Sequence, residues 1–261
     1  MNRLPAASGL QWIRDGFMLF RRQPNQLSLL FLLYVMVNLL LAFIPLIGSL
    51  LLFVLNQVFT TAFMLGCALS EAGREAKPGL LFTYLRGPVL PRLAGLGVLY
   101  VVAVLLAIGA MYLYGGGPLV DAVVQAQGST SGTVNPETQN LVVRTVFFGM
   151  SIYMILIFPL WFAAPLIAWQ GMGVAKAIFF SFFSVLRAIK AFIAYIVAWT
   201  AISLFISINL SALLSLLPGM SEAMALAVMI PCALFLSMLR YCSFYPSYVE
   251  VFGKPALPPQ D

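Results

Sequence analysis

The side chains that could do chemistry in this sequence are mostly uncharged amides, hydroxyls and tyrosines. The chain has no histidine, so the commonest general base and metal ligand is missing. Its three cysteines, Cys67, Cys232 and Cys242, form no CxxC pair and are expected to be buried free thiols. No Walker, G-x-S-x-G or H-E-x-x-H motif is present. The sequence therefore predicts a protein that is not an enzyme and that uses no metal or other cofactor.

Two groups of uncharged polar residues lie inside long apolar segments. Asn38 and Asn56 fall on consecutive segments and could meet, whereas Ser203 and Ser207 are four residues apart and share one helix face. Together these four residues could line a polar path through a membrane. The alternative, which we favour at this point, is hydrogen bonding between helices, worth about 0.6–2 kcal/mol per contact.

Six apolar helices must hold these side chains. The chain of 261 residues is 62% hydrophobic and 8% charged, whereas a soluble domain is about a quarter charged. Its charge-free runs are long enough for spans of about 20 residues and lack the alternation of a β-barrel. The fold class predicted is an all-α polytopic membrane bundle in a single domain, 1–261. The predicted spans are Gln26–Phe43, Ser49–Ser70, Leu93–Tyr114, Val142–Ile167, Ala191–Leu213 and Ala223–Leu239.

The distribution of basic residues predicts how this bundle is oriented. With six spans, thirteen of the fourteen lysines and arginines fall on one side, including Arg240 and Lys254 in the tail, and Arg144 is the exception. By the positive-inside rule both termini are cytoplasmic. Segment 115–141 is predicted to be an outer loop, in which Leu119–Ala126 could form a short interfacial helix; a plain linker is favoured over a ligand-binding lid. No acidic residue lies within a predicted span, which argues against coupled proton transport.

A short motif precedes the first, third and fifth spans. It reads F-x-x-F-R at Phe17–Arg21, and F-x-x-L-R at Phe82–Arg86 and Phe183–Arg187. We interpret this as three parallel pseudo-repeats, each a basic amphipathic helix followed by a transmembrane hairpin, over residues 9–70, 79–168 and 173–245. The alternative is that any inner segment of a membrane protein is basic and aromatic.

The amphipathic segments are predicted to lie in the membrane interface. In the first one, Leu10, Ile13, Phe17 and Phe20 recur at helical spacing, and Trp12 suits an interfacial position. Arginines there face lipid phosphate. The residues expected to contact lipid head groups are Arg21, Arg22, Arg86 and Arg187.

Four stretches of the sequence resemble a family of uncharacterised six-helix inner-membrane proteins found mainly in β-proteobacteria. They are Trp12–Pro24, Phe43–Gly48, Trp161–Pro165 and Ser243–Phe252. The usual tyrosine-then-aspartate ending is replaced here by Val249 and Glu250. The layout is more distantly similar to YciC-like proteins and to the membrane domain of some glycerophosphodiester phosphodiesterases. The resemblance implies a bacterial inner-membrane location and transfers no site residue.

Two hypotheses for function follow. The first is a non-enzymatic protein of envelope or lipid homeostasis, whose basic interfacial helices contact membrane lipids, with a protein partner at the cytoplasmic face left open and no nucleic acid bound. The alternative is a small transporter or lipid-translocating protein that uses the bundle centre. A polar cavity in the centre would favour the alternative, and a tightly packed centre the first hypothesis.

Overall fold

The computed structural model describes residues 4–45, 47–128, 136–217 and 221–257, apart from the side chains of 47, 49, 118–128, 136–138 and 222. Nearly all of these residues are helical, and none of them lies in a strand. Six of the helical segments are long and apolar enough to cross a membrane, so the prediction of an all-α bundle with six spans is confirmed. The helices are α1 (Ala6–Arg22), α2 (Pro24–Ala42), α3 (Ile47–Glu71), η1 (Pro78–Leu85), α4 (Leu90–Gly128), α5 (Pro136–Ile157), η2 (Phe158–Leu160), α6 (Ala163–Gln170), α7 (Val174–Arg187), α8 (Ile189–Ser215) and α9 (Glu222–Phe252).

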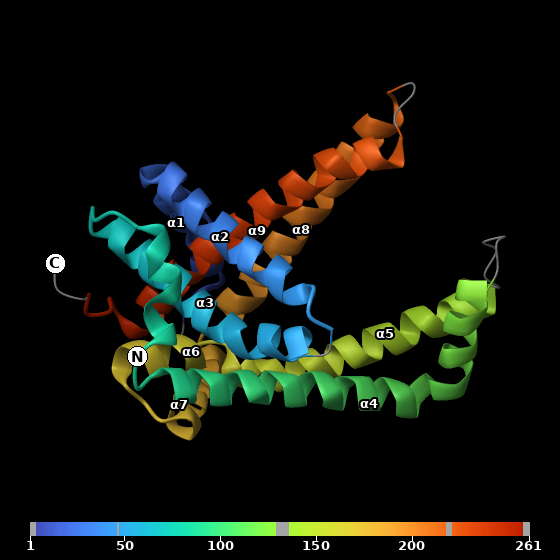
Figure 1. The fold of residues 1–261 in the computed structure, drawn as a ribbon, viewed down its shortest axis with the longest axis horizontal. Coiled ribbons are helices and arrows are strands. Elements are labelled where there is room, and N and C mark those ends of the chain that lie inside the picture. The colour runs from blue at the N-terminus through green and yellow to red at the C-terminus, as the bar shows by residue number, and fades with distance from the viewer. Residues whose placement is uncertain (1–3, 46, 129–135, 218–220, 258–261) are drawn as a thin grey trace.

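The helices form three hairpins that rise from one common base (Figure 1). The hairpins are α2–α3, α4–α5 and α8–α9, and the base contains α1, η1, α6 and α7 together with the C-terminal end of α9. Away from the base, α4–α5 and α8–α9 diverge like the arms of a V, with the shorter α2–α3 hairpin nearer the vertex. The vertex is therefore where all three hairpins come together.

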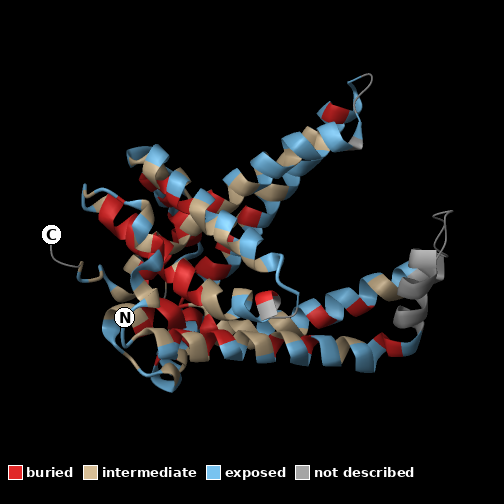
Figure 2. Cartoon of the chain, in the orientation of Figure 1, coloured by how far each residue is buried: buried red, intermediate tan, exposed pale blue. Residues whose placement is uncertain are grey.

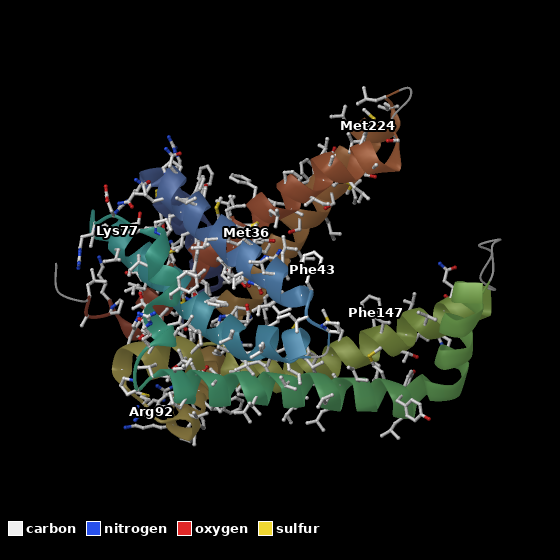
Figure 3. The ribbon with its side chains drawn as sticks, viewed as in Figure 1. Met36, Phe43, Lys77, Arg92, Phe147 and Met224 are labelled. Atoms are coloured by element: carbon white, nitrogen blue, oxygen red, sulfur yellow. The ribbon has the colours of Figure 1, made fainter. Side chains whose placement is uncertain are left out.

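Burial is concentrated in the base and the vertex, as Figure 2 shows. The outer arms, by contrast, are mostly exposed: apolar side chains such as Phe147 and Met224 point away from the protein (Figure 3). Lys77 and Arg92 lie at the base. An apolar surface of this kind is stable only in lipid, so the arms are the membrane-embedded part of the chain.

Two glycines bring α1 against the last hairpin. A Cβ atom on Gly9 would overlap the carbonyl oxygen of Ala191 in α8, and one on Gly16 would lie 2.5 Å from the Cα of Ser243 in α9. Because the glycines are seven residues apart, they lie on one helix face. That face is buried, whereas Leu10 and Phe17 on the predicted apolar face are exposed. Leu10 and Phe17 thus point outward, as membrane-facing residues would, whereas Ile13 and Phe20 of the predicted apolar face are partly buried against the core.

Polar contacts fasten the N-terminal helix to the C-terminal end of the chain. The hydroxyl of Ser8 and the indole N–H of Trp12 both donate to the carboxylate of Glu250. Glu71, at the end of α3, pairs with Lys254 at 3.0 Å and accepts from the hydroxyl of Tyr245 at 2.8 Å. Trp12 is 1% exposed. The prediction that Trp12 occupies an interfacial belt is therefore wrong, because its indole fills the core and satisfies a partly buried carboxylate.

Several element boundaries differ from the predicted ones. Helix α9 does not end near Leu239 but continues to Phe252, so Arg240 belongs to a membrane helix and not to a tail. The fourth candidate span, Gln139–Gln170, is not one continuous α-helix: α5 ends at Ile157, and a 3-10 turn that contains Pro159 joins it to α6. In segment 115–141, the helix suggested for Leu119–Ala126 is present as the continuation of α4 past a non-helical Gly115 to Gly128, and α5 begins at Pro136. Residues 129–135 lie outside the described part.

The three segments predicted to be repeated each contain a helix followed by two membrane helices. These leading helices are α1, the 3-10 helix η1 and α7. The second copy therefore differs from the predicted amphipathic α-helix, because Pro78 and Gly79 begin a short 3-10 helix instead. Phe17, Phe82 and Phe183 are all exposed. Superposition of the three units about one axis stays a prediction.

The orientation of the base also stays a prediction, and it is directly measurable. In a chain whose native cysteines are replaced by alanine, a cysteine at Glu75 in the base loop should be protected from an impermeant maleimide in intact spheroplasts. A cysteine at Asn140, at the end of α5 farther from the base, should be labelled rapidly by the same reagent in the same intact spheroplasts. Both positions are exposed, so burial does not confound the result. The opposite labelling pattern would contradict a cytoplasmic base.

Candidate functional site

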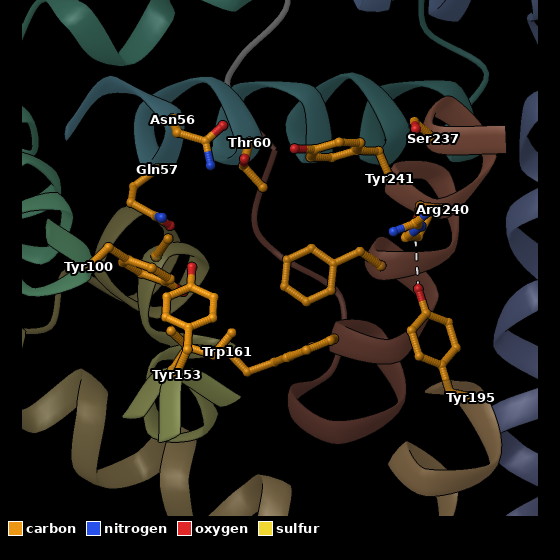
Figure 4. Close-up of a pocket in the computed structure, with 13 residues that line it drawn as sticks. Asn56, Gln57, Thr60, Tyr100, Tyr153, Trp161, Tyr195, Ser237, Arg240 and Tyr241 are labelled. Carbon is orange, nitrogen blue, oxygen red and sulfur yellow. Dashed lines mark hydrogen bonds between the residues drawn. The ribbon is translucent and has the colours of Figure 1, made fainter. Parts of the chain in front are cut away.

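A cavity of about 570 Å³ lies at the vertex of the V, where the three hairpins meet the base. Its wall combines amides, hydroxyls, aromatic rings and one guanidinium group (Figure 4). A cavity with few polar groups among apolar and aromatic ones is typical of a ligand site. The lining residues are Asn56, Gln57, Thr60, Tyr100, Tyr153, Ile157, Trp161, Ala164, Tyr195, Ser237, Arg240, Tyr241 and Phe244.

Helices from every hairpin position these side chains. Thr60 lies 11 residues before the end of α3 at Glu71, and Tyr100 lies 10 residues after the start of α4 at Leu90. At 1.5 Å per residue both are about 15 Å from the base ends of their helices. Arg240 lies 18 residues, about 27 Å, from the outer end of α9 at Glu222, so the cavity lies nearer the base than the outer ends of the arms.

One side of the cavity is held by a hydrogen-bonded chain across three helices. The hydroxyl of Tyr34 in α2 donates to the side-chain oxygen of Asn56 in α3 at 2.7 Å, and lies 3.0 Å from the hydroxyl of Tyr241 in α9. Asn38 does not meet Asn56. Its amide donates instead to the backbone carbonyl of Tyr34, one turn earlier in α2, and it does not line the cavity. Of the two asparagines, only Asn56 belongs to the site.

The opposite side is fixed by the packing of α8 on α9. Tyr195 and Trp199 both reach the hydroxyl of Ser243, at 2.8 and 3.2 Å. The hydroxyl of Tyr195 also lies 3.4 Å from the backbone carbonyl of Arg240. These contacts keep α9 in one rotational setting, so Arg240 and Tyr241 face the cavity together.

Ser203 and Ser207 lie elsewhere, in a second cavity of about 270 Å³ between α8 and α9. The two cavities have Ser237 and Arg240 in common. The predicted polar residues therefore do not line one continuous path. Asn56 lines the vertex cavity, Ser203 and Ser207 line the hairpin cavity, and α9 separates the two.

Arg240 is the functional candidate that sequence reasoning missed. It ended the last charge-free run, so it was taken as the first residue of a tail. A usable signal was present, since Tyr241, Cys242, Tyr245 and Tyr248 continue an aromatic and apolar helical pattern beyond it. Within the described part of the chain, its guanidinium has no hydrogen bond or ion pair. Arg240 is exposed. The indole nitrogen of Trp161, also at the wall, is buried and has no acceptor among the described residues.

The four predicted head-group arginines all lie in the base, at the ends of three elements. Arg21 and Arg22 end α1, Arg86 follows η1, and Arg187 ends α7; all four are exposed. Arg22 also donates to the backbone carbonyl of Glu71 at 3.0 Å. Arg187 lines a groove of about 570 Å³ with the exposed rings of Phe179 and Phe183. The structure therefore places Arg187 beside exposed aromatic rings and does not gather the four arginines into one site.

A cluster of carboxylates in the base is structural. Asp15, Glu71 and Glu250 line a cavity of about 330 Å³, but Glu71 and Glu250 already accept hydrogen bonds from Ser8, Trp12 and Tyr245. Desolvation raises the pKa of Asp15. The positive charge of Arg14 partly lowers this pKa again, and the negative charge of Glu250 raises it further. No group of three histidine, cysteine or acidic side chains in the described residues is arranged to hold a metal ion.

Comparison with known proteins shows the family. A probable inner membrane protein of Burkholderia thailandensis is 32% identical to this chain over 251 residues, which are 95% of this chain and 92% of that protein. The chain belongs to this family of bacterial inner-membrane proteins. An inner-membrane location agrees with the six candidate spans. No protein-family model matches the chain, and no solved structure matches it.

Proposed function

We propose that the protein binds a membrane lipid, or a lipid-like amphiphile, in the vertex cavity, and that it acts in envelope or lipid homeostasis without catalysing a reaction. The observation that supports this proposal is the vertex cavity, which polar and aromatic side chains from all three hairpins line. A tightly packed centre would have favoured a purely interfacial role. The cavity instead favours the lipid-translocating alternative, in which part of a lipid leaves the bilayer and enters the protein.

The shape of the arms supports an amphiphile over a small water-soluble solute. Polar side chains line the vertex cavity and the hairpin cavity, whereas the outer surfaces of the arms, which Figure 2 shows to be exposed, carry many large apolar side chains. A polar head at the vertex could therefore be joined to acyl chains that lie along the arms, in contact with hydrocarbon. A free polar solute would gain nothing from these apolar surfaces.

The base supports a second point of contact with lipid. Phe179, Phe180 and Phe183 are exposed on α7, and the ammonium group of Lys176 lies 6.0 Å from the ring centre of Phe180. A helix with aromatic and basic side chains on its free face binds the membrane interface. We propose that α1 and α7 hold the base on the anionic cytoplasmic leaflet through Arg21, Arg22 and Arg187, with Arg86 after η1. The likeness in layout to YciC-like proteins stays a hypothesis.

Filling the cavity should remove the bound lipid. Thr60 points into the cavity from α3, so Thr60→Phe is expected to lower the lipid retained after detergent purification several-fold. Ser151→Phe is the matched control, because Ser151 is an exposed span residue that bonds to the carbonyl of Phe147 in its own helix. Quantitative lipid mass spectrometry compares the two variants with the natural chain. Equal lipid retention in all three would contradict the proposed site.

A further inference from the structure

Arg240 is an exposed positive charge within the candidate span Ala223–Phe252, and its guanidinium has no counter-ion among the described residues. It lines both the vertex cavity and the hairpin cavity, and no carboxylate is among the described residues that line either one. A charged side chain at membrane depth is costly and usually pairs or marks a functional path. The acidic residues that the structure does place in contact with partners, Glu71 and Glu250, are held in the base.

We propose that the ligand is an anionic phospholipid, whose phosphodiester pairs with the guanidinium of Arg240. This inference rests on the proposed function and names its substrate class. Arginine offers planar, two-point donation to phosphate oxygens. The amide of Gln57 and the hydroxyls of Thr60 and Tyr241 line the same cavity and supply further hydrogen bonds to phosphate or to a hydroxylated head group.

The same lining discriminates against zwitterionic lipids. A phosphatidylethanolamine head carries an ammonium group next to its phosphate, and this group needs an acceptor of opposite charge when it leaves water. The described cavity walls offer no carboxylate, and the guanidinium of Arg240 would repel the ammonium group. A phosphatidylglycerol head has hydroxyls in that place, which the uncharged amides and hydroxyls of the wall can bond.

The hairpin cavity gives the lipid a route to this residue. Ser203 and Ser207 on α8 face Ser237 and Arg240 on α9 across it. Since α8 and α9 form an arm that is exposed on its outer surface, a lipid head that enters between them meets Arg240 before it reaches the vertex cavity. Arg240 would then be the contact common to both positions of the head group.

The decisive experiment measures which lipid stays bound. The full chain is reconstituted in nanodiscs of equal parts phosphatidylglycerol and phosphatidylethanolamine, extracted gently and analysed by native mass spectrometry. The natural chain should retain phosphatidylglycerol preferentially. Arg240→Gln should lower that retention about tenfold, the effect of losing one charge-assisted hydrogen-bonded pair, and Arg240→Lys should lower it less. The control Arg144→Gln, an exposed arginine on α5 outside both cavities, should change nothing.

A second pair of variants tests the route without altering any charge. Ser207→Phe should block the hairpin cavity and slow the uptake of phosphatidylglycerol, whereas Ile208→Phe, whose side chain is exposed on the outside of the same helix, should not. Equal retention of both lipids, unaffected by Arg240→Gln, would overturn the anionic selectivity and leave the proposed lipid site standing. A natural chain that retains no lipid would overturn both.

Discussion

Replacing Gly16 with valine should abolish most of the folded protein. The Cα, backbone nitrogen and Cβ of Ser243 all lie within 2.7 Å of the position that a Cβ on Gly16 would take. Backbone atoms cannot move aside as a flexible side chain can, so α1 would have to leave its seat on α9. We expect destabilisation of about 3 kcal/mol or more, at the upper end of the range for overpacking. Monodisperse yield in detergent and the midpoint of thermal unfolding would report it.

A valine at Gly109 provides the matched control. Gly109 also lies inside a membrane helix, but nothing is within 4 Å of its would-be Cβ, so Gly109→Val should leave the yield and the melting temperature nearly unchanged. Gly97, on the same helix, should behave like Gly16, because a Cβ there would overlap the backbone of Val54 in α3. If the Gly16→Val and Gly109→Val variants had the same melting temperature, the close packing of α1 on α9 would be refuted.

Trp12→Ala should have the second largest effect. The indole is 1% exposed and packs edge-on against Phe192 and Tyr195 of α8. Its removal leaves a large cavity and takes a donor from Glu250, and changes of this kind typically cost about 3–5 kcal/mol. Thermal unfolding of purified protein, followed by the intrinsic fluorescence of the other tryptophans, measures the loss.

Two further variants separate packing from hydrogen bonding at this position. Trp12→Phe keeps most of the ring but leaves the carboxylate of Glu250 with Ser8 alone, which should cost about 1–3 kcal/mol. Leu10→Ala, on the exposed face of the same helix, should lower the melting temperature little. A Trp12→Ala protein as stable as Leu10→Ala would show that α1 is not a core element.

The spans could be predicted closely from the sequence because lipid demands length and apolarity, which composition displays. The predicted spans Gln26–Phe43 and Ser49–Ser70 differ by only a few residues from α2 and α3. The end of the last span was predicted wrongly because the first charged residue after the charge-free run, Arg240, was taken as the membrane boundary. Arg240 instead lies next to cavities, where a guanidinium group can be tolerated inside a span.

Neighbour relations between helices could not be predicted in the same way. In α1 an apolar side chain suits lipid and protein equally, so periodicity identified Leu10 and Phe17 as a face without revealing that the face with Gly9, Trp12 and Gly16 is the buried one. The vertex cavity could not be predicted either, because its lining comes from α3, α4, α5, α6, α8 and α9, with Trp161 between η2 and α6. Only Asn56 among the predicted polar path residues belongs to it.

The seat of α1 on α8 and α9 also sets the order in which the protein can be assembled. Ser8 and Glu250, which are bonded in the finished fold, are 242 residues apart, so the ribosome makes one partner long before the other. At about 5–20 residues per second, α1 waits roughly 10–50 seconds for α9. During that interval its glycine face has no protein to pack against. The first helix to be synthesised is therefore among the last to reach its final position, and docking of α1 marks a chain whose last span has been inserted.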